Sequence, residues 1–194
     1  MLPYIVATVG SFLVGSIPFG WLIAKLKGID IKKEGSGNIG ATNVYRVIGK
    51  KEGALTLLLD LLKGSFAVVL FSLIYKDVKL INIVSALSVV LGHDYSIFLA
   101  FKGGKGVATT YGSTLAVYPP AALSGMFIWI LILITTKYSS LAALVSFLIA
   151  TLISLASNDY YVRVLFVFLY LLMIYKHREN IKRLFRKEES RVKI

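Results

Sequence analysis

The feature that most constrains this chain is a series of long apolar segments separated by short polar stretches. A membrane-spanning helix needs about 20 mostly apolar residues. Six segments meet or approach that length: residues 4–24, 54–75, 80–92 with a few neighbours, 120–136, 139–157 and 160–175. Charged residues are 16% of the 194 residues, against roughly 25% in soluble domains. The pattern therefore predicts an all-α, polytopic integral membrane protein and excludes a disordered chain.

The first apolar segment also carries small residues and a proline. Ser11 and Gly15 are four residues apart, as are Ser16 and Gly20. This spacing lets helices approach closely in lipid, and we expect it to serve packing. Pro18 is expected to kink the segment.

The positive charges between the apolar segments predict the orientation of the chain. Residues 25–52 carry seven basic side chains, and the tail from Lys176 to Lys193 carries eight. Positive charge marks the cytoplasmic side of a membrane, so both stretches should lie there, which requires an odd number of crossings. Residues 107–118 supply a seventh segment, although its length alone also fits a re-entrant helix. We expect about seven transmembrane helices in one domain over residues 1–194, with the amino terminus outside and the carboxyl terminus cytoplasmic.

Charge and cysteine content narrow the classes of partner. The net charge is +12, but the basic residues flank apolar segments, so membrane lipid is a better partner than nucleic acid. The chain has no cysteine, which excludes disulfides, thiol catalysis and cysteine-based zinc sites. We expect no metal and no cofactor.

The first polar stretch, residues 35–46, reads GSGNIGATNVYR. Its G-x-G-x-x-G pattern is not a dinucleotide fingerprint, because no strand precedes it and apolar spans surround it. Glycines and a following helix still favour a bound anion. Asn43 and Arg46 share a helix face, and arginine suits bidentate phosphate binding. The alternative is a flexible loop whose Arg46 pairs with lipid headgroups.

The second polar stretch combines Gly92-His93-Asp94 with residues 101–109, FKGGKGVAT. A Gly-Gly-Lys-Gly loop that opens a helix can hold a phosphate through its amides, the helix dipole and an ammonium group. It is not a Walker A loop, because Leu99 stands where the first glycine would be. His93 next to this loop favours a functional role over a structural one.

The third polar stretch, residues 177–184, reads HRENIKRL. On a helix, His177, Asn180 and Leu184 share one side. The alternative is a solvated basic tail on anionic lipid.

Asp60 and Lys63 lie inside the second apolar segment, where ionisable groups are costly. They form either a structural pair or support for a site.

Together these stretches resemble the three signature motifs of the bacterial acyl-phosphate:glycerol-3-phosphate acyltransferases, the PlsY family. Residues 59–64, LDLLKG, also resemble a family segment. One departure concerns the third motif, which in the family often continues as Gly-x-Glu. Here Phe185-Arg186-Lys187-Glu188 follows, without the glycine.

The resemblance implies an enzyme of the bacterial inner membrane with its active site at the cytoplasmic face. It would move a fatty acyl group from acyl phosphate to the sn-1 hydroxyl of glycerol 3-phosphate, releasing lysophosphatidic acid and phosphate, the first step of phospholipid synthesis. The donor is already activated, so catalysis would depend on positioning and electrostatics.

The resemblance also implies the site residues. The expected catalytic residues are His93, Ser36, Asn180 and Lys105. The expected substrate-binding residues are Gly37, Asn38, Gly40, Thr42, Asn43, Arg46, Lys102, Gly103, Gly104, Gly106, Thr109 and His177. His93 would act as general base or only as a hydrogen-bond donor, with a substrate phosphate taking the proton. Which loop holds which phosphate is left open.

Two other function classes compete with the enzyme. A carrier for an organic phosphate would use the same basic loops and would account for Asp60 and Lys63. Against it, the polar stretches lie on one side, and the sequence shows no pair of broken helices. A membrane scaffold would not need glycines to converge with Asn, His and Lys.

Overall fold

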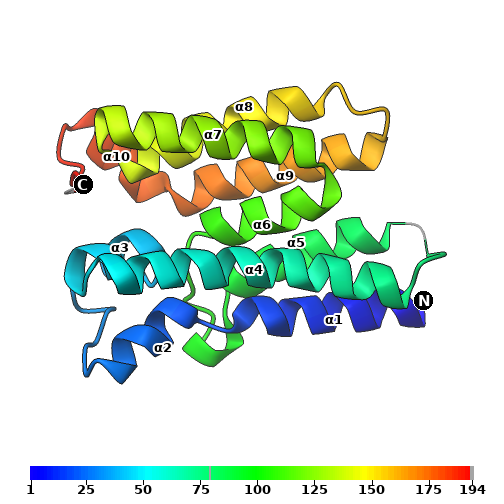
Figure 1. Ribbon diagram of the computed structural model, residues 1–194, viewed down its shortest axis with the longest axis horizontal. Helices are drawn as coiled ribbons and strands as arrows, with labels where there is room; N and C mark the ends of the chain where they lie inside the picture. The colour runs from blue at the N-terminus through cyan, green and yellow to red at the C-terminus, as the bar shows by residue number, and fades with distance from the viewer. Residues whose placement is uncertain (79, 193–194) are drawn as a thin grey trace. The chain divides into compact units, whose positions relative to one another are not determined.

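The fold is entirely helical over the residues that the structure describes. The computed structural model describes residues 1–78 and 80–192, which form α-helices and one 3-10 turn and contain no strand (Figure 1). Lys193, the last basic residue of the tail, lies outside the described residues. The chain divides into two compact units, Met1–Val117 and Tyr118–Ile194, and each is described by itself.

Unit 1 is organised around one long helix. The unit contains α1 (Leu2–Ser16), α2 (Phe19–Leu26), α3 (Ala41–Val47), α4 (Lys50–Ile74), α5 (Ile81–Asp94), the 3-10 turn η1 (Ile97–Leu99) and α6 (Val107–Val117). Helix α4 packs against all five other α-helices of the unit, and α1 packs closely on α5. The polar loops therefore extend from one rigid helical frame.

Glycines set the close contacts between these helices. A Cβ atom on Gly64 of α4 would collide with the Thr109 carbonyl of α6, and one on Gly112 of α6 would collide with the Leu61 carbonyl of α4. Between α1 and α5, Gly15 faces the Val89 carbonyl in the same way. The expected packing role of Gly15 is confirmed, because the two backbones touch where a side chain would separate them.

The first apolar segment is broken where proline was expected to kink it. Helix α1 ends at Ser16, and α2 begins at Phe19 after Ile17 and Pro18. Proline cannot donate the amide that a continuous helix needs. The break leaves backbone carbonyls of this segment open to side-chain donors, and the site described below uses them.

As far as residue 192, where the described part of unit 2 ends, the unit contains three apolar helices and a short basic one. They are α7 (Pro119–Thr136), α8 (Ser139–Ser154), α9 (Tyr160–Lys176) and α10 (Arg178–Phe185). Phe147 of α8 stacks on Phe166 of α9 with ring centres 5.7 Å apart, and Tyr118 meets Phe166 edge-on. Helices α9 and α10 meet at an angle of 62°, so the basic helix turns away from the apolar one.

Several helices are long and apolar enough to cross a membrane. By length and composition these are Leu2–Leu26, Lys50–Ile74, Ile81–Leu99 and Pro119–Thr136, and α9 with α10 makes a fifth if the bent pair is one span. Helix α8 is apolar but shorter, and α6 has 11 residues. The expected all-helical, multi-pass membrane fold is confirmed. The count of seven crossings and the orientation of the termini stay predictions.

Candidate functional site

The first polar stretch is folded around the side chain of Asn43. The Asn43 amide group donates to the carbonyls of Asn38 (2.9 Å), Glu34 (3.0 Å) and Ile31 (3.4 Å). Its side-chain oxygen accepts a hydrogen bond from the Ser36 amide at 2.9 Å. Asn43 is fully buried, so it shapes the loop from beneath. Its expected contact with substrate stays a prediction.

The second polar stretch lies directly on the end of α5. The Gly104 amide donates to the His93 carbonyl at 3.0 Å. A Cβ atom on Gly103 would collide with that carbonyl, and one on Gly104 would collide with Nε2 of the His93 ring. Gly106 has φ +70° and faces Asp94 Oδ1. At these three positions of the loop only glycine fits, because any side chain would collide with His93 or Asp94 beneath the loop.

An apolar cluster brings the first two polar stretches together. Leu99, just before the glycine loop, packs in one buried cluster with Ile31, Ile39 and Val44 of the first stretch. These four side chains are at most 7% exposed. The first two polar stretches therefore lie side by side within unit 1.

The predicted substrate contacts of these stretches differ in exposure. Ser36 and Lys102 are exposed, Arg46 and Lys105 are half-buried, and Thr109 is fully buried. Half-buried positions are also found for Gly37, Asn38, Gly40 and Thr42. Within the described residues, the Arg46 side chain makes no hydrogen bond or ion pair. Its guanidinium is available to an anionic ligand.

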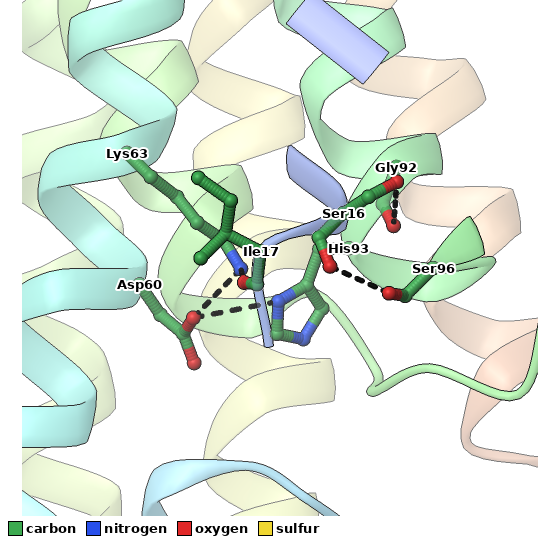
Figure 2. Close-up of polar contacts among 7 residues, drawn as sticks. All are labelled: Ser16, Ile17, Asp60, Lys63, Gly92, His93 and Ser96. Carbon is green, nitrogen blue, oxygen red and sulfur yellow. Dashed lines mark hydrogen bonds and ion pairs between the residues drawn. The ribbon is translucent and has the colours of Figure 1, made fainter. Parts of the chain in front are cut away.

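A buried ion pair lies beneath the glycine loop. Figure 2 shows Lys63 Nζ between two oxygens: it is 2.8 Å from Asp60 Oδ1 and donates to the Ile17 carbonyl at 2.7 Å. Asp60 Oδ1 also lies 3.6 Å from His93 Nδ1, within ion-pair range but longer than a hydrogen bond. Asp60 and Lys63 thus form an ion pair, which fits both readings of the sequence, and it connects α4 to the broken first segment and to His93.

The break at Pro18 is held by further side-chain contacts. The Ser96 hydroxyl donates to the Ser16 carbonyl, and the Ser16 hydroxyl donates to the Gly92 carbonyl at 3.3 Å (Figure 2). The Ile97 amide reaches the Ser16 hydroxyl at 3.4 Å. The segment that leads into the glycine loop is thus fastened to the broken helix. Ser96 was missed by the sequence reasoning, because no motif marks it.

His93 is enclosed rather than open to a ligand. Its side chain is 4% exposed, with Asp60 at Nδ1 and Gly104 at Nε2. General-base catalysis by His93 stays a prediction, and this geometry favours a fixed, positioning role.

In unit 2, the third polar stretch forms the corner between α9 and α10. His177 is buried and donates from Nδ1 to the Met173 carbonyl at 2.9 Å. Asn180 is buried and donates from Nδ2 to Glu189 Oε1 at 2.7 Å. Their expected contacts with substrate stay predictions.

Glu189 gathers the end of the chain. Besides Asn180, its carboxylate accepts hydrogen bonds from the Ser140 hydroxyl (2.7 Å) and from Arg183 Nε (2.8 Å). Burial alone would raise the pKa of Glu189, but these hydrogen bonds outweigh burial and hold that pKa below its usual range. The sequence reasoning missed Glu189. Sequence analysis considered Glu188 at the end of the third motif, and the glutamate that binds Asn180 is the next residue, Glu189.

Comparison with known proteins identifies the family of this chain. The profile of the family described as "Glycerol-3-phosphate acyltransferase" matches residues 5–187. The chain belongs to this family. The PlsY resemblance inferred from the three motifs is thereby confirmed.

Individual relatives of the family match over nearly the whole chain. Glycerol-3-phosphate acyltransferase 2 of Thermotoga maritima is 43% identical over 95% of this chain and 94% of its own length. The glycerol-3-phosphate acyltransferase of Aquifex aeolicus is 44% identical over 93% and 95%. Crystal structures of PlsY, an integral membrane glycerol 3-phosphate acyltransferase, are 41% identical and cover 97% of this chain and 94% of their own. The glycerol 3-phosphate form has a TM-score of 0.92 and the lysophosphatidic acid form 0.89.

The hydrogen bonds of Asn43 predict a clear consequence of its removal. Asn43→Ala should free the loop at residues 31–38 and lower the free energy of unfolding by roughly 3–4 kcal/mol, at about 1 kcal/mol per net hydrogen bond. Trypsin cleavage after the exposed Lys32 and Lys33 should become faster. Ser36→Ala is the matched control, since Ser36 contacts Asn43 through its backbone amide. Equal protection of both variants would contradict the assigned role.

The lowered pKa of Glu189 predicts a pH dependence of stability. A carboxyl with a folded pKa below its unfolded value, about 4.3, stabilises the fold above that value and loses this contribution as the pH falls through the folded pKa. Glu189→Gln should lower the thermal midpoint at pH 7 and lose less stability than the wild type between pH 5 and pH 3. The exposed neighbour offers the control Glu188→Gln, which should follow the wild type. Parallel curves for Glu189→Gln and the wild type would count against the carboxylate hub.

Proposed function

We propose that this protein transfers a fatty acyl group from acyl phosphate to the sn-1 hydroxyl of glycerol 3-phosphate, forming lysophosphatidic acid and phosphate. This would be the first step of phospholipid synthesis in a bacterial inner membrane. The observation that carries the proposal is the family match over residues 5–187. That match crosses the division between the two units, which supports one acyltransferase domain over the whole chain.

The reaction needs few chemical groups from the protein. The sn-1 oxygen attacks the acyl carbon, the bond from that carbon to the phosphate oxygen breaks, and phosphate leaves with the bonding electrons. The hydroxyl proton would pass to a substrate phosphate oxygen, because the enclosed His93 ring has no open surface toward a ligand. The acyl phosphate is a mixed anhydride, so no acyl-enzyme intermediate is required. Rate enhancement would come from holding two anionic substrates in line and from stabilising the developing oxyanion.

The two loops of unit 1 suit two phosphate groups. The Gly103–Gly106 loop with Lys105 would hold one phosphate through backbone amides and an ammonium group. Ser36, Asn38 and Arg46 would meet the other, and the unpaired guanidinium of Arg46 supports this role. Further proposed contacts are Gly37, Gly40, Thr42, Lys102, Thr109 and His177, with Asn180 as a donor to the developing charge. The buried Asn43 would act by shaping the loop.

Seven crossings remain the topology that best fits the charges. The amino terminus would lie outside, and both basic stretches and the active site would face the cytoplasm.

The chain has no cysteine, so single introduced cysteines can report on which side of the membrane a residue lies without background labelling. Lys137→Cys should be shielded from an impermeant thiol reagent in intact cells, and Ser157→Cys should react. The reverse pattern would overturn the orientation.

The proposed reaction is tested by phosphate release from palmitoyl phosphate by pure, detergent-solubilised protein. We expect release that depends on glycerol 3-phosphate and equals the lysophosphatidic acid formed. Folded protein that releases no phosphate would return an organic-phosphate carrier to first place. Uptake of glycerol phosphate into liposomes would then be measured.

Replacing the two cations should separate specific contacts from general charge. Lys105→Ala and Arg46→Ala should each lower turnover by roughly 100-fold or more, the scale of losing one charge-stabilising donor, while the protein stays folded. Lys50→Ala removes one exposed charge from the same basic stretch and should keep its activity. Normal turnover of Lys105→Ala and Arg46→Ala would disprove the assigned site.

A further inference from the structure

The Asp60 carboxylate has a second contact that neutralising Lys63 does not explain. Asp60 and Lys63 lie three residues apart on α4 and can balance each other's charge. The same carboxylate oxygen also faces His93 Nδ1 at 3.6 Å. The side chains of Asp60, Lys63 and His93 are at most 4% exposed. None of them has the open surface that a directly contacting ligand would need, so they act through their neighbours.

The neighbour of His93 is the glycine loop. The loop is tied to His93 through the backbone, because the Gly104 amide donates to the His93 carbonyl at 3.0 Å. It is also in contact with the ring, because a single added carbon at Gly104 would collide with Nε2. The ring therefore lies between the Asp60 carboxylate at one nitrogen and the loop backbone at the other.

We infer that Asp60 is a positioning residue for the glycine loop: its carboxylate fixes the His93 ring, and the ring sets the position of Gly103–Gly106. Lys63 anchors Asp60 in turn, because its ammonium group also binds the Ile17 carbonyl at the break in the first segment. The loop is thus set from three segments: the break, α4 and the end of α5. His93 serves as a buried spacer in this arrangement.

The inference rests on the proposed function in one respect: the ligand of the loop is a phosphate group, carried by acyl phosphate or by glycerol 3-phosphate. A loop that binds through its amides depends on their exact placement, and in enzymes a misplacement of about 1 Å can lower the reaction rate roughly 100-fold. Loss of the Asp60 charge should therefore appear as weaker binding of whichever phosphate the loop holds.

The first test measures binding, so that its result does not depend on turnover. Dissociation constants of glycerol 3-phosphate and of a non-hydrolysable acyl phosphate analogue are measured by calorimetry for the wild type, Asp60→Asn and Ser65→Ala. Ser65 lies on the same helix and donates to the Gly112 carbonyl of α6 at 2.8 Å, so its removal loses a polar contact of α4 away from His93. Asp60→Asn should weaken one ligand by about tenfold or more, with both constants unchanged in Ser65→Ala.

The outcomes of this test separate the inference from the proposed function. Unchanged binding in folded Asp60→Asn overturns the inference, as does a wild type that binds neither ligand. A wild type that binds both ligands but transfers no acyl group contradicts the proposed function, and the binding ratio still decides the role of Asp60.

A second set of variants leaves α4 intact and covers the case in which Asp60→Asn does not fold. Gly104→Ala places a methyl group against the His93 ring and should weaken phosphate binding by displacing the loop. His93→Ala removes the ring and makes room for that methyl group. The double variant should therefore bind better than the product of the two single effects predicts. Strictly additive effects would show that the ring and the loop are independent and would overturn the inference.

Discussion

The ion pair of Lys63 with Asp60 beneath the break at Pro18 is the contact on which unit 1 depends. Proline interrupts the helix, and Lys63 donates to the Ile17 carbonyl at that point. A buried ammonium group alone would cost several kcal/mol, so it needs a counter-charge. Asp60 supplies it at 2.8 Å and extends to His93. Removing either partner would leave a buried charge uncompensated, which is more damaging than losing an exposed pair. The break at Pro18 leaves the Ile17 carbonyl without a helical partner, and the Lys63 ammonium group donates to it. The break and the ion pair therefore depend on each other.

The glycine contacts explain why such a device can act on a loop. Gly103 and Gly104 lie so close to His93 that no side chain fits between them. Close packing of this kind transmits displacement, because interiors have few voids into which a moved group can relax. The same contact in an open loop would have no consequence. In unit 1, the glycine loop thus lies directly against the end of α5, with no space between the loop backbone and His93.

Sequence reasoning reached the fold and the two loops of unit 1 because their signals are local. Apolar length predicts helices, Pro18 predicts a break, and glycine with lysine predicts an anion loop. It could not predict what Asn43 does, since its partners are backbone groups of residues 31–38, and backbone groups leave no trace in residue types. Glu189 was missed for a related reason. The third motif lacks the glycine that often follows it in the family. Lys187 nevertheless adopts φ +60°, a conformation that glycine favours. The chain therefore turns at Lys187 without a glycine, and Glu189 reaches Asn180.

These contacts divide the predicted site residues of unit 1 into two groups by what surrounds them. Asn43 and His93 are enclosed by backbone and by charged neighbours, whereas Ser36, Arg46 and Lys102 lie at or near the surface. A motif search cannot make this division, because both groups sit in the same short stretches of sequence. Burial makes it, since a side chain whose polar atoms are already satisfied inside the protein gains little by meeting a substrate. The residues that build the loops and the residues proposed to bind substrate are interleaved along the chain, so an alanine substitution in either group is expected to lower activity. Stability and ligand affinity measured on the same variant separate the two groups: loss of affinity at unchanged stability identifies a residue that binds, and loss of both identifies a residue that builds the loop.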